Sequence, residues 1–262
     1  MNQKHDHDDI SRQWCLTRPE IESLQLQRLN QVLHVASHHP FYRDRMGAVR
    51  LPLKSLDQLA ELPLISKSDL VAESPGEPGR IFSLPRASYT RFHQTSGTSG
   101  HPMPVLDTAD DWRWWLDCWQ HVLHAAEIVP TDVAMMAFSF GPFIGFWTAS
   151  DALVRADALV IPGGGMSSET RLQMIIDHQC TVVCCTPTYA LHLMAVAEKL
   201  SIDLRNTSVT RLIVAGDPGG SVPAIRSRIP EGWNAKVIDH SGASEIGAWG
   251  FGSRDGKGLH VI

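Results

Sequence analysis

The spacing of apolar residues changes along the chain, and the change divides a shorter first part from a longer second part. In the first part, apolar positions recur at helical spacing over Leu29–Ala36. They predict a helix that begins at Thr17 and ends before Pro40. Two shorter helices are expected to begin near Ser55 and Ser66, each after a residue type that caps helices.

In the second part, apolar runs alternate with amphipathic segments. The runs expected to form buried strands are Val133–Phe138, Ala158–Ile161, Thr181–Cys185, Arg211–Ala215 and Lys236–Ile238. The segments expected to form helices are Thr108–Ala126, Ser168–His178, Tyr189–Leu200 and Val222–Arg228. This alternation predicts an α/β fold with largely parallel sheets flanked by helices. Residues 1–80 are expected to form a helical N-terminal region, and residues 81–262 an α/β region.

Tryptophan is concentrated in one segment, because four of the eight tryptophans lie between Trp112 and Trp119. On a helix, Trp112, Trp115 and Trp119 share one face with Leu116 and Leu123. Large aromatic side chains mostly serve burial, so this pattern favours core packing over a ligand-binding box.

Composition and charge exclude several classes of protein. Apolar residues make up 43% and charged residues 19% of the chain, which is typical of a protein with a hydrophobic core. A net charge of −5 gives no reason to expect nucleic acid or an anionic membrane as a partner. Five cysteines, an odd number, argue against a disulfide framework and favour a reducing compartment such as the cytoplasm.

Two uncharged stretches approach the length of a membrane span, and both are interrupted. Val133–Ser150 contains Gly141 and Pro142, and Cys180–Ala197 contains Pro187. A spanning helix needs about 20 consecutive apolar residues, so a strand followed by a turn and a packed helix is the better interpretation of both stretches.

The most informative segment is a short loop of glycines and hydroxyl residues that follows an expected strand over Tyr89–His93. The loop consists of Thr95, Ser96, Gly97, Thr98, Ser99 and Gly100. Glycines let an anion approach the main chain closely, and consecutive backbone N–H groups form a concave anion site. A flexible surface loop is the alternative. The segment is not a Walker A loop, since His101 follows Gly100, and no G-x-G-x-x-G motif supports a dinucleotide fold.

The sequence T-S-G-T-S-G-H-P resembles the phosphate-binding signature of the adenylate-forming enzymes, in particular their phenylacetate–CoA ligase branch. Further segments resemble motifs of that branch and occur in the same order along the chain. An ordered series of motifs is more specific than any single motif. These segments are Phe41–Arg43, Leu62–Leu70, Phe138–Phe143, Ile161–Gly165, Cys185–Ala190, Ala215–Pro218 and Ser241–Glu245. The resemblance covers about Pro40 to Ile262.

The resemblance implies ATP-dependent activation of a carboxylic acid as an acyl-adenylate, followed by transfer to a thiol such as coenzyme A. It implies ATP, Mg²⁺ and coenzyme A as ligands. The loop from Thr95 to Gly100 would hold the β- and γ-phosphates, Glu245 would bind Mg²⁺, and Ser244 would lie beside it. The residues that would border the adenine are Gly216, Asp217, Pro218, His240, Ser241, Gly242 and Ala243. Those that would line the acyl pocket are Phe138, Phe140, Gly141, Phe143, Tyr189 and Ala190.

The chain departs from the family pattern at several of these positions. Ser241 stands where the family has an aromatic residue that stacks on adenine, which leaves two alternatives: His240 substitutes by stacking, or adenine is held more weakly. Asp217 replaces a commoner glutamate, and Pro142 lies inside the aryl-pocket motif. The expected substrate is therefore an aryl or other apolar acid, and not necessarily phenylacetate.

Family members also continue beyond the matched region with a mobile domain that supplies a catalytic lysine, and this domain is expected to be absent here. Lys67, Lys236 and Lys257 do not occur in the matching context. Three interpretations stay open: part of an acid–thiol ligase, a degenerate module that binds a nucleotide or acyl ligand without turnover, and a structural α/β protein. The expected partners are a small carboxylic acid, a coenzyme A or carrier-protein thiol, and a second copy of the chain in a homodimer.

Overall fold

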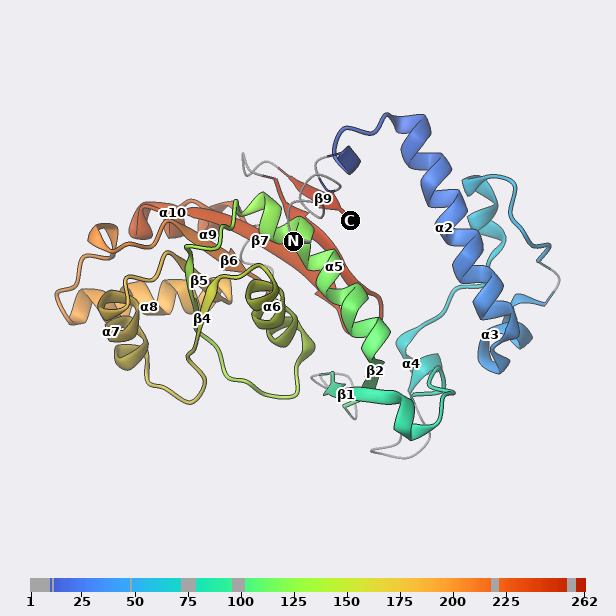
Figure 1. The fold of residues 1–262 in the computed structure, drawn as a ribbon, viewed down its shortest axis with the longest axis horizontal. Coiled ribbons are helices and arrows are strands. Elements are labelled where there is room, and N and C mark those ends of the chain that lie inside the picture. The colour runs from blue at the N-terminus through green and yellow to red at the C-terminus, as the bar shows by residue number, and fades with distance from the viewer. Residues whose placement is uncertain are drawn as a thin grey trace. The chain divides into compact units, whose positions relative to one another are not determined.

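The computed structural model describes residues 10, 12–47, 49–71, 79–95, 102–217, 222–253 and 258–262 (Figure 1). The chain divides into two compact units. The first comprises Asn2–Thr90 and Ser96–Leu106, and the second comprises Arg91–Thr95 and Asp107–Ile262.

Helices dominate the first unit. Its elements are α2 (Arg18–His38), α3 (Pro40–Met46), η1 (Leu56–Glu61), α4 (Lys67–Leu70) and η2 (Arg86–Ser88). Helix α2 begins after Thr17, whose backbone N–H donates to Glu20 Oε2 at 2.7 Å, as a capping box requires. It ends before Pro40, and short helices follow Ser55 and Ser66. The predicted helices of this region are therefore confirmed.

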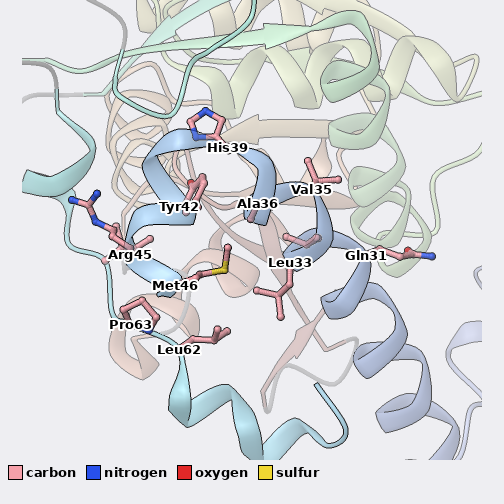
Figure 2. A pocket seen from close by; sticks show the side chains of 12 residues that line it. Gln31, Leu33, Val35, Ala36, His39, Tyr42, Arg45, Met46, Leu62 and Pro63 are labelled. Atoms are coloured by element: carbon pink, nitrogen blue, oxygen red, sulfur yellow. The ribbon is translucent and has the colours of Figure 1, made fainter. Parts of the chain in front are cut away.

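An apolar groove of about 620 Å³ lies in the first unit, between α2, α3 and the segment after η1 (Figure 2). Leu33 and Ala36 from α2, Met46 from α3, and Leu62 are among its lining residues. Its one charged lining residue, Arg45, places its guanidinium 3.9 Å from the Phe41 ring centroid. The groove therefore offers apolar surface and little polar chemistry.

Two strands, β1 (Tyr89–Gln94) and β2 (Pro104–Thr108), form a two-stranded sheet, and the boundary between the units falls within both. The observed β1 confirms the strand predicted at Tyr89–His93.

A seven-stranded sheet forms the centre of the second unit, in the order β4-β3-β5-β6-β7-β8-β9. The strands are β3 (Val133–Met136), β4 (Leu159–Pro162), β5 (Val182–Cys185), β6 (Arg211–Val214), β7 (Lys236–Ala243), β8 (Gly247–Gly252) and β9 (Leu259–Val261). Strands β3 to β7 are parallel, whereas β7–β8 and β8–β9 pair antiparallel. The five predicted strands are confirmed, although β7 runs five residues beyond Ile238. The predicted burial is wrong for β4, which pairs with one strand only in the described sheet and whose Leu159 is 61% exposed.

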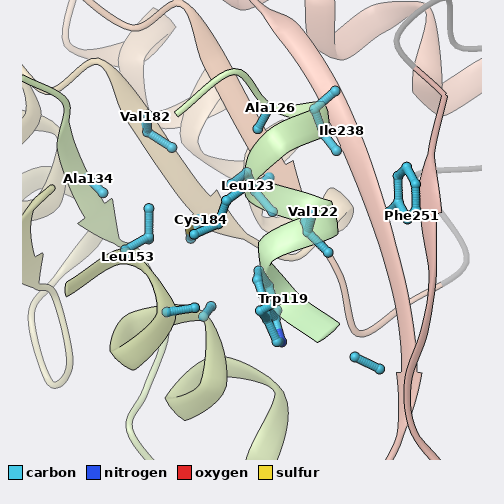
Figure 3. Packing of buried hydrophobic residues seen from close by; sticks show 14 of the residues in the cluster. Trp119, Val122, Leu123, Ala126, Ala134, Leu153, Val182, Cys184, Ile238 and Phe251 are labelled. Atoms are coloured by element: carbon cyan, nitrogen blue, oxygen red, sulfur yellow. The ribbon is translucent and has the colours of Figure 1, made fainter. Parts of the chain in front are cut away.

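Helices cover both faces of this sheet. The helices are α5 (Ala109–Ala125), α6 (Ile144–Arg155), α7 (Ser168–Asp177), α8 (Pro187–Lys199), α9 (Pro223–Arg226) and α10 (Arg228–Trp233). Because side chains alternate along a strand, Cys184 packs with α5 and α6 on one face (Figure 3). Val183 and Cys185 pack with α7, α8 and α10 on the other face. One helix was predicted at Val222–Arg228, but the structure has two short helices there, α9 and α10, and the second extends to Trp233.

The two uncharged stretches form strand–loop–helix units, as predicted. One contains β3 and the start of α6, and the other contains β5 and most of α8. No helix within the described part of the chain has both the length and the apolar character that a membrane span requires.

A buried ion pair lies at the amino ends of the parallel strands. Arg211, at the start of β6, donates through Nη2 to Asp132 Oδ1 at 2.5 Å and through Nη1 to Oδ2 at 3.1 Å. Asp132 also accepts from Thr181 Oγ1 at 2.7 Å and from the Val129 N–H at 2.8 Å. Hydrogen bonds therefore satisfy both carboxylate oxygens, which is what a buried charge requires.

The order of the strands contains one topological switch point. From β3 the chain crosses through α6 to β4 on one side, and through α7 it returns past β3 to β5 on the other. In open parallel sheets, ligands bind outside the carboxyl ends of the strands at such a point. The fold itself therefore directs attention to the loops after β3 and β5.

Candidate functional site

The structure places most of the predicted site residues at one edge of the sheet. Strands β3 to β7 are parallel, so their carboxyl ends share that edge. The loop after β3 carries Phe138–Phe143, and the loop after β5 leads into Tyr189. Gly216 and Asp217 follow β6, and Ser241–Ala243 end β7. The predicted acyl and adenine residues are thus brought to one edge from four different strands.

Aromatic rings organise the loop after β3. Phe138 stacks on Phe146 with ring centroids 3.9 Å apart, and Phe140 meets Trp147 edge-on at 4.7 Å. Trp147 Nε1 donates to the Gly141 carbonyl at 2.9 Å, which ties the loop to α6. Phe143, the residue before α6, is 46% exposed. Sequence reasoning missed Phe146 and Trp147, because they lie on a helix outside the matched motif.

The loop after β4 approaches this aromatic loop closely at Gly164. A Cβ atom at Gly164 would lie 2.9 Å from Phe140 Cδ2 and 3.5 Å from the Phe140 backbone nitrogen. A side chain at Gly164 would displace the Phe140 ring, and a Cβ at Gly163 would lie 2.7 Å from the Met136 carbonyl oxygen, so the loop approaches its neighbours closely at two glycines.

The loops after β5 and β6 are joined by a side-chain hydrogen bond. Thr188 Oγ1 donates to Asp217 Oδ2 at 2.8 Å. Gly216 has a φ of +94°, a backbone conformation that favours glycine. Pro218 lies outside the described residues. Asp217 is therefore held against the start of α8.

Tyr189 belongs to a polar cluster that the sequence did not reveal. Its hydroxyl lies 2.9 Å from Ser168 Oγ, which in turn lies 3.1 Å from His192 Nε2. The Arg171 guanidinium lies 5.0 Å from the centroid of the Tyr189 ring, and its Nε donates to the Gly163 carbonyl at 2.8 Å. These residues come from α7 and α8, and no local motif marks them.

Ala190 lies in the hydrophobic core. Its side chain is fully buried, and its carbonyl accepts from Trp233 Nε1 at 3.4 Å. This position makes Ala190 a packing residue behind the loop.

Thr95, the first residue of the glycine-rich loop, lies close to the aromatic loop. The N–H of the preceding residue, Gln94, donates to the Pro142 carbonyl at 2.7 Å, and Thr95 is 7% exposed. Ser96, Gly97, Thr98, Ser99 and Gly100 lie outside the described residues. The strand residue before the loop, Gln94, is therefore hydrogen-bonded to the proposed acyl-pocket segment.

Ser244 and Glu245 lie in the turn between β7 and β8. The Ile246 N–H donates to the Ala243 carbonyl at 3.2 Å and closes this turn, and the strand pairing shifts register between Ser241 and Gly242. Within the part of the chain that the structure describes, no group of three or more acidic, histidine or cysteine side chains could hold a metal ion. One carboxylate still suits Mg²⁺, which is commonly bound by one or two carboxylates together with substrate phosphates.

His240 does not fit the predicted role of stacking on adenine. It is 6% exposed, its Nδ1 lies 3.0 Å from the Gly250 carbonyl, and its ring packs on Trp119 with centroids 4.4 Å apart. The ring therefore belongs to the core between β7, β8 and α5. Burial lowers the pKa of His240 to about 4, although the hydrogen bond to Gly250 opposes the shift.

This pKa predicts that the protein loses stability in mild acid. The unfolded chain takes up a proton at His240 below about pH 6.5, but the folded protein does so only near pH 4, so stability falls as the pH drops through that window. The expected contribution is a loss of about 2 kcal/mol between about pH 7.5 and about pH 5. Urea unfolding of the wild type and of His240→Gln at both pH values measures it. Equal acid sensitivity in both proteins would contradict the assignment.

The buried cysteines are core residues and not nucleophiles. Burial raises the pKa of Cys180 to about 11 and that of Cys184 to about 12, and it raises the pKa of Cys185 as well. A thiol needs to ionise to attack or to bind a metal, so these positions do not support cysteine chemistry.

Comparison with curated proteins finds relatives over most of the chain. The phenylacetate–coenzyme A ligase of Aromatoleum evansii is 30% identical over 234 residues, which are 88% of this chain and 52% of that protein. The enzyme of the same name from Escherichia coli K12 is 30% identical over 232 residues, 87% of this chain and 52% of that protein. The chain thus spans about half the length of the curated relatives it matches. No protein-family model matches it.

Comparison with solved structures agrees. A 2-hydroxyisobutyryl-CoA ligase in complex with 2-HIB-AMP and CoA, in its thioesterification state, is 30% identical with a TM-score of 0.86, over 93% of this chain and 54% of that one. An open conformation of this ligase gives a TM-score of 0.85 at 29% identity, over 93% of this chain and 59% of that one. These matches confirm the predicted α/β fold.

Proposed function

Because the chain is a relative of the phenylacetate–coenzyme A ligases, in the adenylate-forming superfamily, we propose that it binds ATP and a carboxylic acid for adenylate formation. The observation that carries this proposal is the meeting of loops from β3, β5, β6 and β7 at one sheet edge, beside the topological switch point. Four of the ordered motifs, which begin at Phe138, Cys185, Ala215 and Ser241, have described residues at the carboxyl ends of β3, β5, β6 and β7, whereas Phe41–Arg43 and Leu62–Leu70 belong to the other unit.

The proposed reaction has two steps. A carboxylate oxygen of the acid attacks the α-phosphorus of ATP, and the bond to pyrophosphate breaks, which leaves an acyl-adenylate. The sulfur of coenzyme A then attacks the acyl carbon, the carbon–oxygen bond to AMP breaks, and the thiol proton is released. Negative charge builds up on phosphate oxygens in the first step, so the proposed contribution of the protein is charge stabilisation and positioning.

Each group of site residues has a proposed part in this reaction. Backbone N–H groups between Thr95 and Gly100 bind the β- and γ-phosphates, while Gly216, Asp217 and Ser241–Ala243 border the adenine. Glu245 binds Mg²⁺, with Ser244 beside it. Mg²⁺ supplies neutralisation of phosphate charge when bound.

The proposed acid is aryl or otherwise apolar. Phe138 and Phe140 pack with the α6 aromatics, and Phe143 stands 46% exposed at the end of the same loop. Aromatic and apolar walls favour an apolar acyl group over a charged one. The Tyr189 hydroxyl, hydrogen-bonded to Ser168, is the polar group that the proposed pocket offers.

A titration with a non-hydrolysable acyl-adenylate analogue tests this function. Phenylacetyl and benzoyl analogues are expected to bind at least about tenfold more tightly than AMP, because they occupy the acyl pocket as well as the nucleotide site. A succinyl analogue is the matched control, and its affinity should exceed that of AMP by a smaller factor because its acyl group is charged. If every analogue binds with the same affinity as AMP, the protein has no acyl pocket and the proposal is refuted on that point.

A second candidate function is a module that binds nucleotide or acyl ligand without turnover. The observation that favours it is the absence of an aromatic ring at Ser241, combined with the burial of His240 against Trp119. Acid-dependent exchange of pyrophosphate into ATP separates the two functions. Exchange above background supports the ligase, and analogue binding without exchange supports the module.

The location and assembly of the protein are further parts of the proposal. We assign it to the cytoplasm, on the odd number of cysteines and on the core positions of Cys180, Cys184 and Cys185. A coenzyme A or carrier-protein thiol is the proposed acceptor, and a homodimer is the proposed assembly. Sedimentation velocity measures the assembly directly.

A further inference from the structure

The tryptophan-rich helix α5 contacts the two segments that the proposed nucleotide site needs. Three of its four tryptophans are buried, namely Trp112, Trp115 and Trp119. This confirms the predicted core face. Trp114 differs, because 49% of it is exposed, and its ring meets Trp115 edge-on with centroids 5.8 Å apart.

Towards its amino end, α5 holds the strand that leads into the glycine-rich loop. His93, two residues before Thr95, stacks on Trp112 with centroids 5.4 Å apart and planes 11° from parallel. His93 Nδ1 lies 3.3 Å from Asp107 Oδ2, and Trp115 Nε1 donates to Asp107 Oδ1 at 3.2 Å. Thr95 is therefore attached to α5 through a short chain of buried contacts.

The same helix also contacts the strand that follows the Glu245 turn. The Trp114 ring lies so close to Gly247 that a Cβ atom there would be 2.3 Å from Trp114 Cη2 and 2.7 Å from Cζ3. Gly247 has a φ of +101°, so both its backbone conformation and its neighbour require glycine. Gly247 is two residues after Glu245 and pairs with Ala243 across the hairpin.

Strands β7 and β8 are held in the seven-stranded sheet, but the turn that joins them lies beyond the paired residues, and binding is weakened when a ligand must order its site. The indole over Gly247 adds a contact from helix α5, which also packs against β8. We propose that Trp114 is a positioning residue for the nucleotide site, which holds the turn bearing Ser244 and Glu245 at a fixed place relative to Thr95. This inference rests on the proposed function, because it assigns a task to Trp114 only if Glu245 binds the metal of a magnesium nucleotide.

Substitution of Trp114 tests the proposal through magnesium dependence. Trp114→Ala should weaken binding of Mg·ATP by about fivefold to twentyfold and leave binding of ATP in EDTA nearly unchanged, because only the metal-binding turn moves. Trp114→Phe keeps an aromatic face over Gly247 and should restore most of the loss. Trp14→Ala, at a partly exposed tryptophan of the other unit, is the matched control and should behave as wild type.

The outcomes separate this inference from the function on which it rests. If the wild-type chain shows no magnesium-dependent binding of ATP, the proposed function fails. If the wild type shows it and Trp114→Ala shows it equally, the function stands and the positioning role is refuted. Unfolding in urea is measured for each variant. If Trp114→Ala is unfolded, the intact Trp114→Leu variant takes its place, and an unchanged magnesium response there overturns the proposal.

Discussion

Replacing Asp132 with alanine is expected to lower the free energy of unfolding by about 3–5 kcal/mol, because it leaves the Arg211 charge without its partner. The side chain of Asp132 is 3% exposed and that of Arg211 is 14% exposed. Two further donors, Thr181 Oγ1 and the Val129 N–H, would also lose their acceptor. The network joins the segments that enter β3, β5 and β6, so its loss affects the whole sheet.

Urea unfolding of Asp132→Ala beside Asp117→Ala measures this effect. Asp117 pairs with Arg155 at 2.6 Å, but its side chain is 61% exposed, so its loss should cost less than about 1 kcal/mol. Asp132→Asn keeps the size of the side chain and loses the charge, so its loss of unfolding free energy should lie between those of the two alanine variants. A loss at Asp132 no larger than that at Asp117 would contradict the interpretation that burial makes this ion pair important.

Replacing Glu245 with glutamine is expected to remove most of the magnesium dependence of nucleotide binding. The substitution keeps the size of the side chain and takes away the charge that a hard cation prefers, so the affinity for Mg·ATP should fall by about tenfold or more. The affinity for ATP without metal should change little. Calorimetric titration at several Mg²⁺ concentrations measures the effect.

Glu231→Gln is the matched control, because Glu231 is an exposed glutamate on α10 in the same unit. It should leave both affinities unchanged. A magnesium response of Glu245→Gln that equals that of the wild type would show that the metal is held elsewhere, and the proposed role of the β7–β8 turn would have to be given up.

Elements with strong periodicity could be predicted from the sequence, and elements rich in glycine could not. The parallel strands are mostly apolar runs and were placed within one or two residues, except at the end of β7; β5 is fully buried, whereas β4 is not. Strand β8 reads G-A-W-G-F-G, which is typical of a loop. Close packing against the neighbouring strand accounts for a glycine here, since a Cβ at Gly250 would lie 2.2 Å from Leu259 Cδ2. Such a constraint exists only after the strands have paired.

The candidate site shows the same division. Motif residues such as Phe138 and Glu245 could be proposed because they stand in a recognisable order, whereas Ser168, Arg171 and His192 meet Tyr189 only through the packing of α7 and α8. The prediction that His240 stacks on adenine was wrong, because here the order of the motifs suggested a ligand contact that the packing does not allow. His240 was assigned to a ligand-binding loop, but β7 continues through it and buries it against Trp119.

The most direct test of the central claim is a calorimetric titration of Mg·ATP into the wild-type chain and into Gly97→Val. The valine side chain would block the close approach of phosphate to the main chain of the Thr95–Gly100 loop. If the loop holds the phosphates, the wild type binds saturably and the folded variant shows no measurable binding. Binding of equal affinity to both proteins, or no binding to the wild type, would contradict this claim.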